Sequence, residues 1–274
     1  MNIFDEMLAV YAPKSQQDQL NALHEVMQQV CLAGLARGGF MEKAAFYGGT
    51  CLRIFHGLER FSEDMDFSLL TPAPDFRLEP YFDAVREEFA LMGQQVTLTE
   101  KKKTKLSAVQ SAFQKSETAQ YDLQLERGRA IKIKIEVDTA PPLGFATEQQ
   151  LLLQPYSFYT RCYTLPCLFA GKMHALLFRA WKNRVKGRDW YDFEWYVRKG
   201  IPMNWAHFCE RAGAFNQEEA LTPEHFTELL RERLSSVPIE QVKSDVLPFV
   251  RRPSELDIWS TDYFLHLAER MKTE

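Results

Sequence analysis

The segment from Phe46 to Leu70, FYGGTCLRIFHGLERFSEDMDFSLL, constrains the fold more than any other part of the chain. An apolar run leads into Gly48, Gly49 and Thr50, and a short amphipathic stretch separates this turn from a second apolar run. Glycines allow the backbone to turn sharply and to approach a ligand closely, and short apolar runs bounded by turns are typical of strands. The segment therefore predicts a strand, a glycine turn, a short helix and a second strand in immediate succession.

The rest of the chain predicts an α+β fold. Apolar residues at helical spacing predict helices on both sides of the opening segment, and alternating runs predict further strands. From about Leu165 onward only helical patterns remain. We therefore expect a mixed α/β core over residues 1–160 and a helical domain over residues 161–274. The expected strands are 43–47, 65–70, 95–99, 119–125 and 131–138, the last two joined by a turn at Gly128, and the expected helices include 17–37, 78–92 and 50–55, which Thr50 caps and Gly57 closes.

Asp64 and Asp66 are placed for metal chemistry at the start of the second strand. Side chains two residues apart on a strand point to the same face, with their Cα atoms roughly 7 Å apart. Two carboxylates held this close repel each other unless a cation lies between them, and oxygen ligands favour Mg²⁺. The pair therefore predicts a divalent-metal site, with a solvated acidic strand edge as the simpler alternative.

A third carboxylate is available on the strand expected at 131–138. Glu136 and Asp138 both lie on its polar face, and their spacing does not choose between them. Three carboxylates on adjacent strands can hold two Mg²⁺ ions for an in-line displacement at phosphorus. We therefore expect Glu136 or Asp138 to complete the ligand set begun by Asp64 and Asp66.

The glycine turn supplies a candidate site for phosphate. The N–H groups at the start of the following helix, and the positive end of its dipole, attract anions. Arg53, three residues after Thr50, can lie on the same face of that helix. Gly48, Gly49, Thr50 and Arg53 are therefore candidates to bind a triphosphate, and an ordinary capped turn is the alternative for each motif taken singly.

Composition excludes several other classes of protein. The five cysteines form no CxxC pair, the six histidines show no metal-ligand spacing, and a net charge of −4 does not by itself indicate nucleic-acid binding. No apolar run approaches the ~18 residues that span a membrane, and the N-terminus lacks the basic and apolar regions of a signal peptide. We therefore expect a cytoplasmic protein with reduced thiols and no membrane partner.

The order of these motifs resembles the nucleotidyltransferase superfamily of DNA polymerase beta type, in which GG[TS] precedes [DE]x[DE] on the next strand. The resemblance implies the core of that superfamily, with a mixed sheet, followed by a helical C-terminal domain. More narrowly, it resembles the AbiEii/MenT family of abortive-infection and toxin–antitoxin nucleotidyltransferases. The resemblance implies that Ser62 also helps to bind the nucleotide, and the IKIEV element at 133–137 favours Glu136 as the third carboxylate. The residues that match the family's GGT-x-L-R and R-x-S-x-D-x-D-F/L elements include Arg53, Arg60, Ser62, Asp64, Asp66 and Phe67.

The resemblance continues into the helical half. FAGKMHALLFR at 169–179 and KGRDWYDFEWYV at 186–197 are similar to the family's K-x-x-A-L-x-x-R and R-D-x-x-D elements. Lys172 interrupts an apolar helical stripe, and such inward charges are rare unless they are paired or liganded. By resemblance Lys172 would contact the triphosphate and Asp189 would be a catalytic or site-organising residue, so that the helical domain completes the active site. Asp192 would orient a neighbour, with a helix-surface acid near the N-terminus as the alternative. A structural Lys–Asp ion pair is the alternative for Lys172.

Basic residues and tryptophans are interleaved between residues 172 and 199. Such a patch suits an RNA backbone and stacked bases, and a solvated helix pair with core tryptophans is the alternative. A second run of lysines lies within 101–105. The basic residues of the patch are Lys172, Arg179, Lys182, Arg184, Lys186, Arg188, Arg198 and Lys199, and its tryptophans are Trp181, Trp190 and Trp195.

The resemblance implies an Mg²⁺-dependent nucleotidyltransferase that transfers NMP from an NTP and releases pyrophosphate. It further implies a toxin that acts on the 3′ end of tRNA, with a separately encoded antitoxin, in a toxin–antitoxin or phage-defence system. Two other functions stay open from the residues. One is the same chemistry on a protein or small-molecule hydroxyl, and the other is a non-catalytic nucleotide- or RNA-binding module, against which the intact carboxylates argue.

Overall fold

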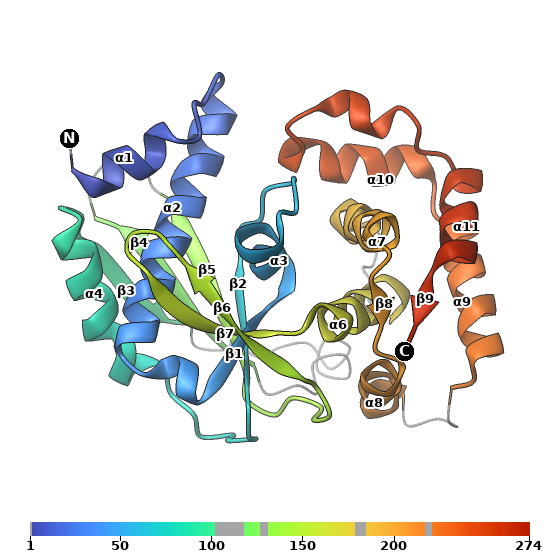
Figure 1. Ribbon diagram of the computed structural model, residues 1–274, viewed down its shortest axis with the longest axis horizontal. Coiled ribbons are helices and arrows are strands. Elements are labelled where there is room, and N and C mark those ends of the chain that lie inside the picture. The colour runs from blue at the N-terminus through green and yellow to red at the C-terminus, as the bar shows by residue number, and fades with distance from the viewer. Residues whose placement is uncertain (1, 102–117, 127–130, 179–184, 217–220) are drawn as a thin grey trace. The chain divides into compact units, whose positions relative to one another are not determined.

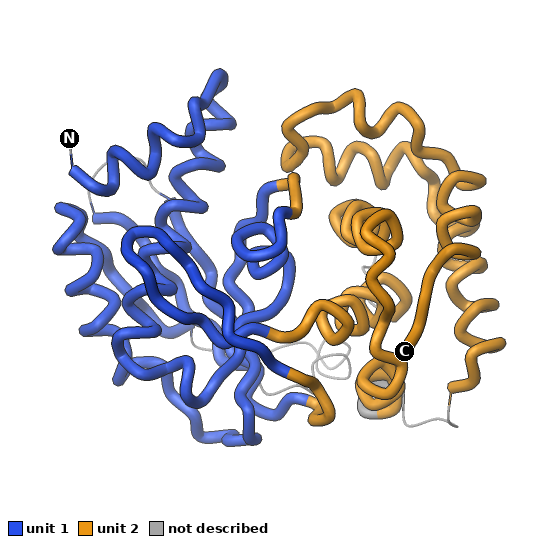
Figure 2. Tube along the Cα trace, viewed as in Figure 1, with its two compact units in different colours: residues 1–57, 61–141, 147–162 blue, residues 58–60, 142–146, 163–274 orange. Residues whose placement is uncertain are grey.

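The computed structural model describes residues 2–101, 118–126, 131–178, 185–216 and 221–274. Contacts within the chain divide it into two compact units (Figure 2). Unit 1 comprises residues 1–57, 61–141 and 147–162, and unit 2 comprises residues 58–60, 142–146 and 163–274. No helix within the described ranges combines the length and the apolarity needed to cross a bilayer.

Over the residues that the structure describes, unit 1 is built on a seven-stranded mixed sheet (Figure 1). Its strands are β1 (Ala44–Tyr47), β2 (Met65–Leu69), β3 (Val96–Glu100), β4 (Thr118–Leu125), β5 (Lys132–Asp138), β6 (Thr147–Leu152) and β7 (Phe158–Tyr163). They lie in the order β3-β4-β5-β2-β1-β7-β6. The β3-β4-β5 strands and the β1-β2 pair are antiparallel, whereas β2 runs parallel to β5 and β1 runs parallel to β7. The predicted α+β class with a mixed sheet is therefore confirmed.

The helices of unit 1 follow largely from sequence periodicity and capping. They are α1 (Ile3–Ala9), α2 (Gln16–Arg37), α3 (Gly48–His56) and α4 (Phe82–Leu91), with 3-10 turns η1 (Phe40–Glu42) and η2 (Glu79–Tyr81). Ser15 and Asp18 form a capping box at the start of α2. Helix α2 packs beside α4 (Figure 1), and a Cβ on Gly34 would lie 2.6 Å from Cα of Val85, so glycine permits this close approach. The helix predicted at 78–92 begins instead with η2, which contains a proline.

The parallel strands β2 and β5 place apolar side chains on one face of the sheet and polar side chains on the other. Met65 and Phe67 on β2 are buried, as are the alternate residues Ile133 and Ile135 on β5. The ring of Phe67 lies 5.0 Å from that of Phe46 and 5.1 Å from that of Phe40, measured between centroids. Period-two alternation places the intervening residues on the other face. One face of these strands therefore forms core, and the other is available for a polar site.

Unit 2 is mostly helical. It contains α6 (Leu165–Phe178), α7 (Gly187–Lys199), α8 (Trp205–Asn216), α9 (Pro223–Ser236), α10 (Ile239–Val246), α11 (Thr261–Arg270), the turns η3 (Leu247–Phe249) and η4 (Pro253–Leu256), and the short parallel pair β8 (Pro202–Met203) and β9 (Lys272–Thr273). The rings of Phe169 and Tyr196 stack at 4.3 Å between α6 and α7. At Gly187 a Cβ would collide with the carbonyl oxygen of Val242, so glycine lets α7 begin against α10.

Strands β6 and β7 were not predicted. The segment 147–152 carries Glu148, Gln149 and Gln150 in succession, so it lacks the apolar alternation that indicates a strand. The predicted turn at Gly128 lies outside the described residues.

Candidate active site

Strands β2 and β5 bring two of the predicted carboxylates side by side. In the parallel β2–β5 pair, Asp66 is in register with Glu136. In-register residues of neighbouring strands share a face of the sheet, and both side chains are partly exposed. On its other side Asp66 is paired with Tyr47 of β1, the residue immediately before the glycine turn. The polar face of unit 1 therefore carries adjacent carboxylates next to the start of α3.

Glycine is required where α3 begins. Gly48 has a φ of +82°, and a Cβ at this position would collide with Oδ2 of Asp66 and lie 3.1 Å from its Cγ. Tyr47 occupies the N-cap position without a side-chain cap hydrogen bond. The first turn of α3 therefore presents its backbone N–H groups, and the positive end of the helix dipole, close to the Asp66 carboxylate.

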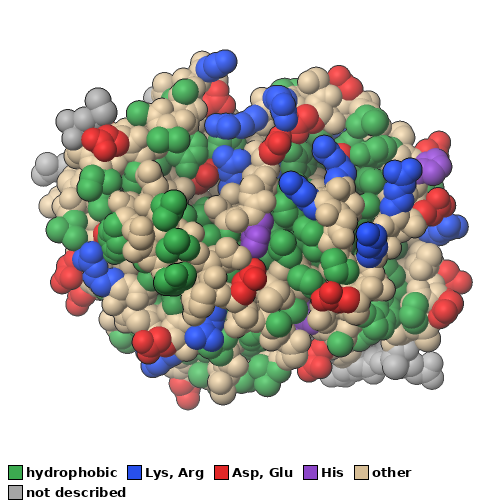
Figure 3. All heavy atoms as spheres, in the orientation of Figure 1, with side chains coloured by type: hydrophobic (Ala, Val, Ile, Leu, Met, Phe, Trp, Pro, Cys, Tyr) green, Lys and Arg blue, Asp and Glu red, His purple; other side chains and the backbone are tan. Residues whose placement is uncertain are grey.

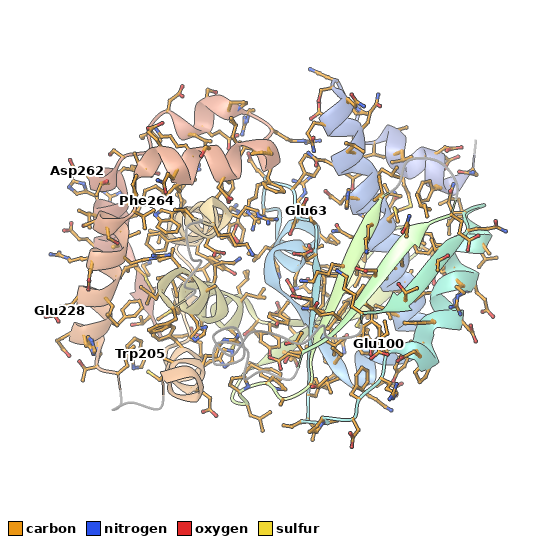
Figure 4. The ribbon with its side chains drawn as sticks, turned by 180° about the vertical axis from the view of Figure 1, so that it is seen from behind. Glu63, Glu100, Trp205, Glu228, Asp262 and Phe264 are labelled. Atoms are coloured by element: carbon orange, nitrogen blue, oxygen red, sulfur yellow. The ribbon has the colours of Figure 1, made fainter. Side chains whose placement is uncertain are left out.

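The loop that leads into Asp64 is anchored from two helices. Nε2 of Gln28, a buried residue of α2, donates to the carbonyl oxygens of Ser62 at 3.0 Å and Glu63 at 2.9 Å. The hydroxyl of Thr50 donates to the carbonyl oxygen of Asp64. Figure 4 labels Glu63 within this loop. These bonds fix the backbone just before β2, so Asp64 is held one residue before the strand.

Gln28 is a positioning residue that the sequence analysis missed. The available signal was a polar side chain, followed by a second one at Gln29, within the mostly apolar part of α2 from Val26 to Leu35. A buried amide requires hydrogen-bond partners, which would have indicated a contact with backbone, although not with this loop.

Thr50 and Arg53 have structural partners in unit 1. Thr50 was predicted to cap α3, and this is wrong, because the helix begins at Gly48 and the buried Thr50 hydroxyl bonds to Asp64. Nε of Arg53 lies 2.8 Å from Oε2 of Glu25, and its guanidinium lies 4.6 Å from the centroid of the Phe61 ring. Nucleotide contacts by Thr50, Arg53 and Ser62 stay predictions.

Glu136 is engaged by two side chains of its own sheet. Its Oε1 accepts a hydrogen bond from Nε2 of Gln120 at 2.8 Å and forms an ion pair with Nζ of Lys134. Burial acts to lower the pKa of Lys134, but the hydrogen bond and charge of Glu136, with the charges of Asp64 and Asp66, outweigh it and raise that pKa. A cation supplied by the protein itself therefore lies in the field of all three carboxylates.

Asp138, the alternative third carboxylate, faces a different environment. It is in register with Ser68 rather than Asp66. It is buried, and its Oδ1 accepts the backbone N–H of Ala140 at 3.2 Å. This geometry favours Glu136 over Asp138 as the partner of Asp66.

The carboxylates have the hard oxygen chemistry that Mg²⁺ takes. Asp66 and Glu136 are neighbours, and Asp64 is two residues away on the same chain segment. Across the described parts of the chain, however, no three His, Cys, Asp or Glu side chains are grouped as a ready metal-ligand set. The carboxylate oxygens are suitable ligands for a divalent ion. The Glu136 carboxylate, however, contacts Lys134 and Gln120 rather than the other two carboxylates.

Unit 2 contains a buried charge cluster made by the later motifs. Nζ of Lys172 lies 3.1 Å from Oδ1 of Asp189 and 2.8 Å from Oδ2 of Asp192. Arg60 donates to both oxygens of Asp192, from Nε and Nη2, at 2.6 Å each. The structure thus places Lys172 in the ion pair that was the alternative to a triphosphate contact, and Asp192 orients Lys172 and Arg60.

Arg233 of α9 lies near this cluster. Its Nε donates to the carbonyl oxygen of Leu176 at 3.0 Å, and its guanidinium lies 5.5 Å from the ring centroid of Trp190. Burial lowers the pKa of Arg233, and the charge of Asp189 opposes this shift. The Asp189 carboxylate therefore interacts electrostatically with both Lys172 and Arg233.

The expected basic and aromatic patch is only partly described. Trp190 and Trp195 are buried, so they belong to the core of unit 2 and do not offer rings for base stacking. The guanidinium of Arg188 lies 4.1 Å from the Phe249 ring centroid. On the face seen in Figure 3, Lys and Arg side chains are interspersed with hydrophobic and acidic ones. The described residues do not include the rest of the patch, namely Arg179, Trp181, Lys182 and Arg184, or the lysines after Lys101.

Several solved structures share the fold of this chain. The nucleotidyltransferase toxin MenT4 from Mycobacterium tuberculosis H37Rv has 15% identity and a TM-score of 0.62 over 97% of this chain and 87% of its own. A putative nucleotidyltransferase from H. pylori has 18% identity and a TM-score of 0.52 over 93% of this chain and 94% of its own. JHP933 from Helicobacter pylori has 16% identity and a TM-score of 0.52 over 93% of this chain and 91% of its own. The fold is that of the nucleotidyltransferases.

Sequence comparison identifies the family. A family model described as nucleotidyl transferase AbiEii toxin, type IV TA system, matches residues 30–267. The chain therefore belongs to the AbiEii family of nucleotidyltransferase toxins, as the motifs around the glycine turn predicted. A search of curated proteins gave no match.

Proposed function

We propose that this AbiEii-family nucleotidyltransferase transfers NMP from an NTP to the 3′ end of tRNA, as the toxin of a toxin–antitoxin or phage-defence system. Family membership supports the NTP substrate and an antitoxin partner. The observation that carries the proposal is the register of Asp66 with Glu136 beside Gly48, where α3 begins. Carboxylates and a phosphate-binding turn thereby share one face of unit 1.

The chemistry divides among the residues of this face. The N–H groups at Gly48 and Gly49 and the dipole of α3 would bind the phosphates of the NTP. Asp64 and Asp66 would hold a divalent ion, Mg²⁺ in this proposal, which supplies charge neutralisation when it is bound. Glu136, the third proposed ligand, is also placed to take the proton of an acceptor hydroxyl. The hydroxyl oxygen then forms a bond to the α-phosphorus, and the bond to pyrophosphate breaks.

Lys172 and Asp189 are proposed to act in the same reaction on the strength of the family motifs. Lys172 is a cation whose position is fixed by Asp189 and Asp192. A fixed cation that needs no rearrangement is effective at stabilising charge that develops on transferring phosphates. Lys172→Met should therefore lower transfer strongly, and Lys172→Arg should restore little of it, since the larger planar guanidinium does not place its charge where the ammonium lies between the two carboxylates.

The test is transfer of label from each α-³²P-labelled NTP to total RNA in the presence of Mg²⁺. The wild type should label a band of tRNA size, and mass spectrometry should find added nucleotides at tRNA 3′ ends. Asp66→Asn should abolish the labelling, whereas Asp83→Asn, at a side chain that is 87% exposed on α4, should not. Equal labelling by the wild type and Asp66→Asn would refute the proposal. Label in protein or in a small molecule would assign a different acceptor.

A further inference from the structure

Lys134 lies within the IKIEV element at 133–137, in which the family resemblance gives a role only to Glu136, yet Lys134 contacts the carboxylate site directly. It lies on β5 two residues before Glu136, on the same face of the sheet, and its Nζ pairs with Oε1 of Glu136. The Lys134 side chain is 32% exposed and that of Glu136 is 25% exposed. Asp64 and Asp66 also act on Lys134 through their charges. The ammonium therefore compensates an acidic cluster that would otherwise be self-repelling.

We propose that Lys134 is the counter-cation of the carboxylate site. Its ammonium pairs with Glu136 in the metal-free protein and releases Glu136 when a divalent ion binds. The inference rests on the proposed function, because it takes Asp64, Asp66 and Glu136 as the metal-binding carboxylates. It also explains why three acidic residues brought together by β2 and β5 do not form a ready ligand set among the described residues.

The side chain of Lys134 can make this exchange without moving the sheet. Its backbone is fixed in β5, which pairs with β4 on one side and with β2 on the other. Asp122 of β4 is in register with Lys134, and Asp66 of β2 is in register with Glu136. Lysine carries its charge on a flexible four-carbon stem, and a side chain that is one third exposed can turn its ammonium to water. Gln120 still donates to Glu136 at 2.8 Å, so the carboxylate stays oriented after Lys134 leaves.

Lys132 provides a matched control on the same strand and face. Its Nζ lies 2.6 Å from Oδ2 of Asp122, and its side chain is 50% exposed. Lys132→Met therefore removes the same charge and the same type of ion pair, two residues away from Lys134, without a contact to Glu136. Any general effect of one fewer lysine on metal affinity should appear in both variants.

The experiment is calorimetric titration of the metal-stripped, nucleotide-free protein with MnCl₂. Lys134→Met removes the cation that competes with the metal for the partly exposed Glu136 carboxylate. Its Kd for Mn²⁺ should therefore be roughly three- to tenfold lower than that of the wild type. Lys134→Arg should raise the Kd, because a guanidinium can hold the carboxylate with two hydrogen bonds. Lys132→Met should stay within about twofold of the wild type. In a Glu136→Gln background, Lys134→Met should change the Kd less than about twofold, because the carboxylate for which the lysine competes is absent.

A second readout separates this role from ordinary structural support. In EDTA the midpoint of thermal unfolding should fall in Lys134→Met, and Mn²⁺ should raise it by more than in the wild type. A lysine that only supports the sheet would lower the midpoint equally with and without metal.

An unchanged or higher Kd in Lys134→Met, the same Kd decrease in Lys132→Met, or no Mn²⁺ binding by the wild type would each overturn the inference. The transfer assay judges the proposed function separately. Mn²⁺ binding that tightens in Lys134→Met, in a protein that labels no RNA, would reject the RNA acceptor and support the role of Lys134.

Discussion

Replacing Asp192 should destabilise unit 2 more than replacing either of its cationic partners. The carboxylate is fully buried, accepts two hydrogen bonds of 2.6 Å from Arg60, and lies 2.8 Å from Nζ of Lys172. In Asp192→Leu both cations lose this partner at once. In Arg60→Met the carboxylate keeps Lys172, and in Lys172→Met it keeps Arg60.

The magnitude follows from the burial of the cluster. Removing one partner of a buried ion pair leaves the other charge uncompensated and costs about 3–5 kcal/mol. We expect this full range for Asp192→Leu, and about half of it for Arg60→Met, since Lys172 still compensates the remaining carboxylate. The double variant Arg60→Met/Asp192→Leu should cost less than the sum of the single variants, with a coupling of about 1–3 kcal/mol.

Tryptophan fluorescence during urea unfolding measures this effect in unit 2 alone. All five tryptophans of the chain lie within residues 163–274, at positions 181, 190, 195, 205 and 259. The exposed pair of Arg252 with Glu59, at 2.7 Å and with side chains 68% and 57% exposed, is the control, and Glu59→Gln should cost less than about 1 kcal/mol. The reasoning is refuted if Asp192→Leu is within about 1 kcal/mol of the wild type, or if the costs of the single variants simply add.

Three further predictions concern backbone strain, loop anchoring and pH. Gly48→Ala should lower NMP transfer at least about tenfold, because its Cβ would displace the Asp66 carboxylate. Gly39→Ala, at φ +81° with no atom within 4 Å of its Cβ, should cost about 1 kcal/mol of stability and leave transfer unchanged; equal transfer rates in the two variants would contradict this account. Gln28→Leu should lower transfer and cost about 2–3 kcal/mol in urea unfolding, because it removes the two hydrogen bonds that Gln28 donates to the carbonyl oxygens of the loop just before Asp64. Transfer at the wild-type rate in this variant would show that the anchor is dispensable. Burial, with the charge of Arg211, lowers the pKa of His207 to about 4. Between pH 6.5 and pH 4 the unfolded chain therefore takes up a proton that the folded chain does not, so the free energy of unfolding decreases as pH falls from about 6.5 toward 4. Relative to His207→Phe, the wild type should lose up to about 3 kcal/mol between pH 7 and pH 4, and a constant difference in unfolding free energy across this range would contradict the assignment.

The local part of the candidate site could be predicted from the sequence because its signals are local. Gly48 and the apolar runs on either side predicted β1, α3 and β2 to within a few residues. The approach of Asp66 to Glu136, by contrast, depends on the parallel pairing of β2 with β5, whose residues are far apart in the chain. Strand patterns show that Glu136 lies on a polar face, but they do not specify which strand becomes its neighbour. Family resemblance supplied that step, and the register supports it.

Side-chain partners were the least predictable feature. Arg53 has a position suited to phosphate on a helical projection, yet Glu25 and Phe61 engage it. Gln28 carries no motif, yet it anchors the loop before Asp64. In each case the deciding partner comes from α2 or from the loop before β2, and its approach is set by packing. A sequence pattern gives the direction of a side chain relative to its own element, and the identity of its partner requires the tertiary structure.

Lys172 and Lys134, the two lysines that contact carboxylates of the proposed active site, differ in how far a bound ligand can change their position. Lys172 is 13% exposed and contacts two carboxylates that are at most 3% exposed, one of which also holds Arg60. Its departure would break contacts to two buried carboxylates at once, which costs more than the loss of an exposed ion pair, so Lys172 is a fixed cation. Lys134 is 32% exposed and contacts one partly exposed carboxylate that Gln120 also holds. Its ammonium can reach water at little cost, so a ligand-dependent change in electrostatics is expected at Lys134 and not at Lys172.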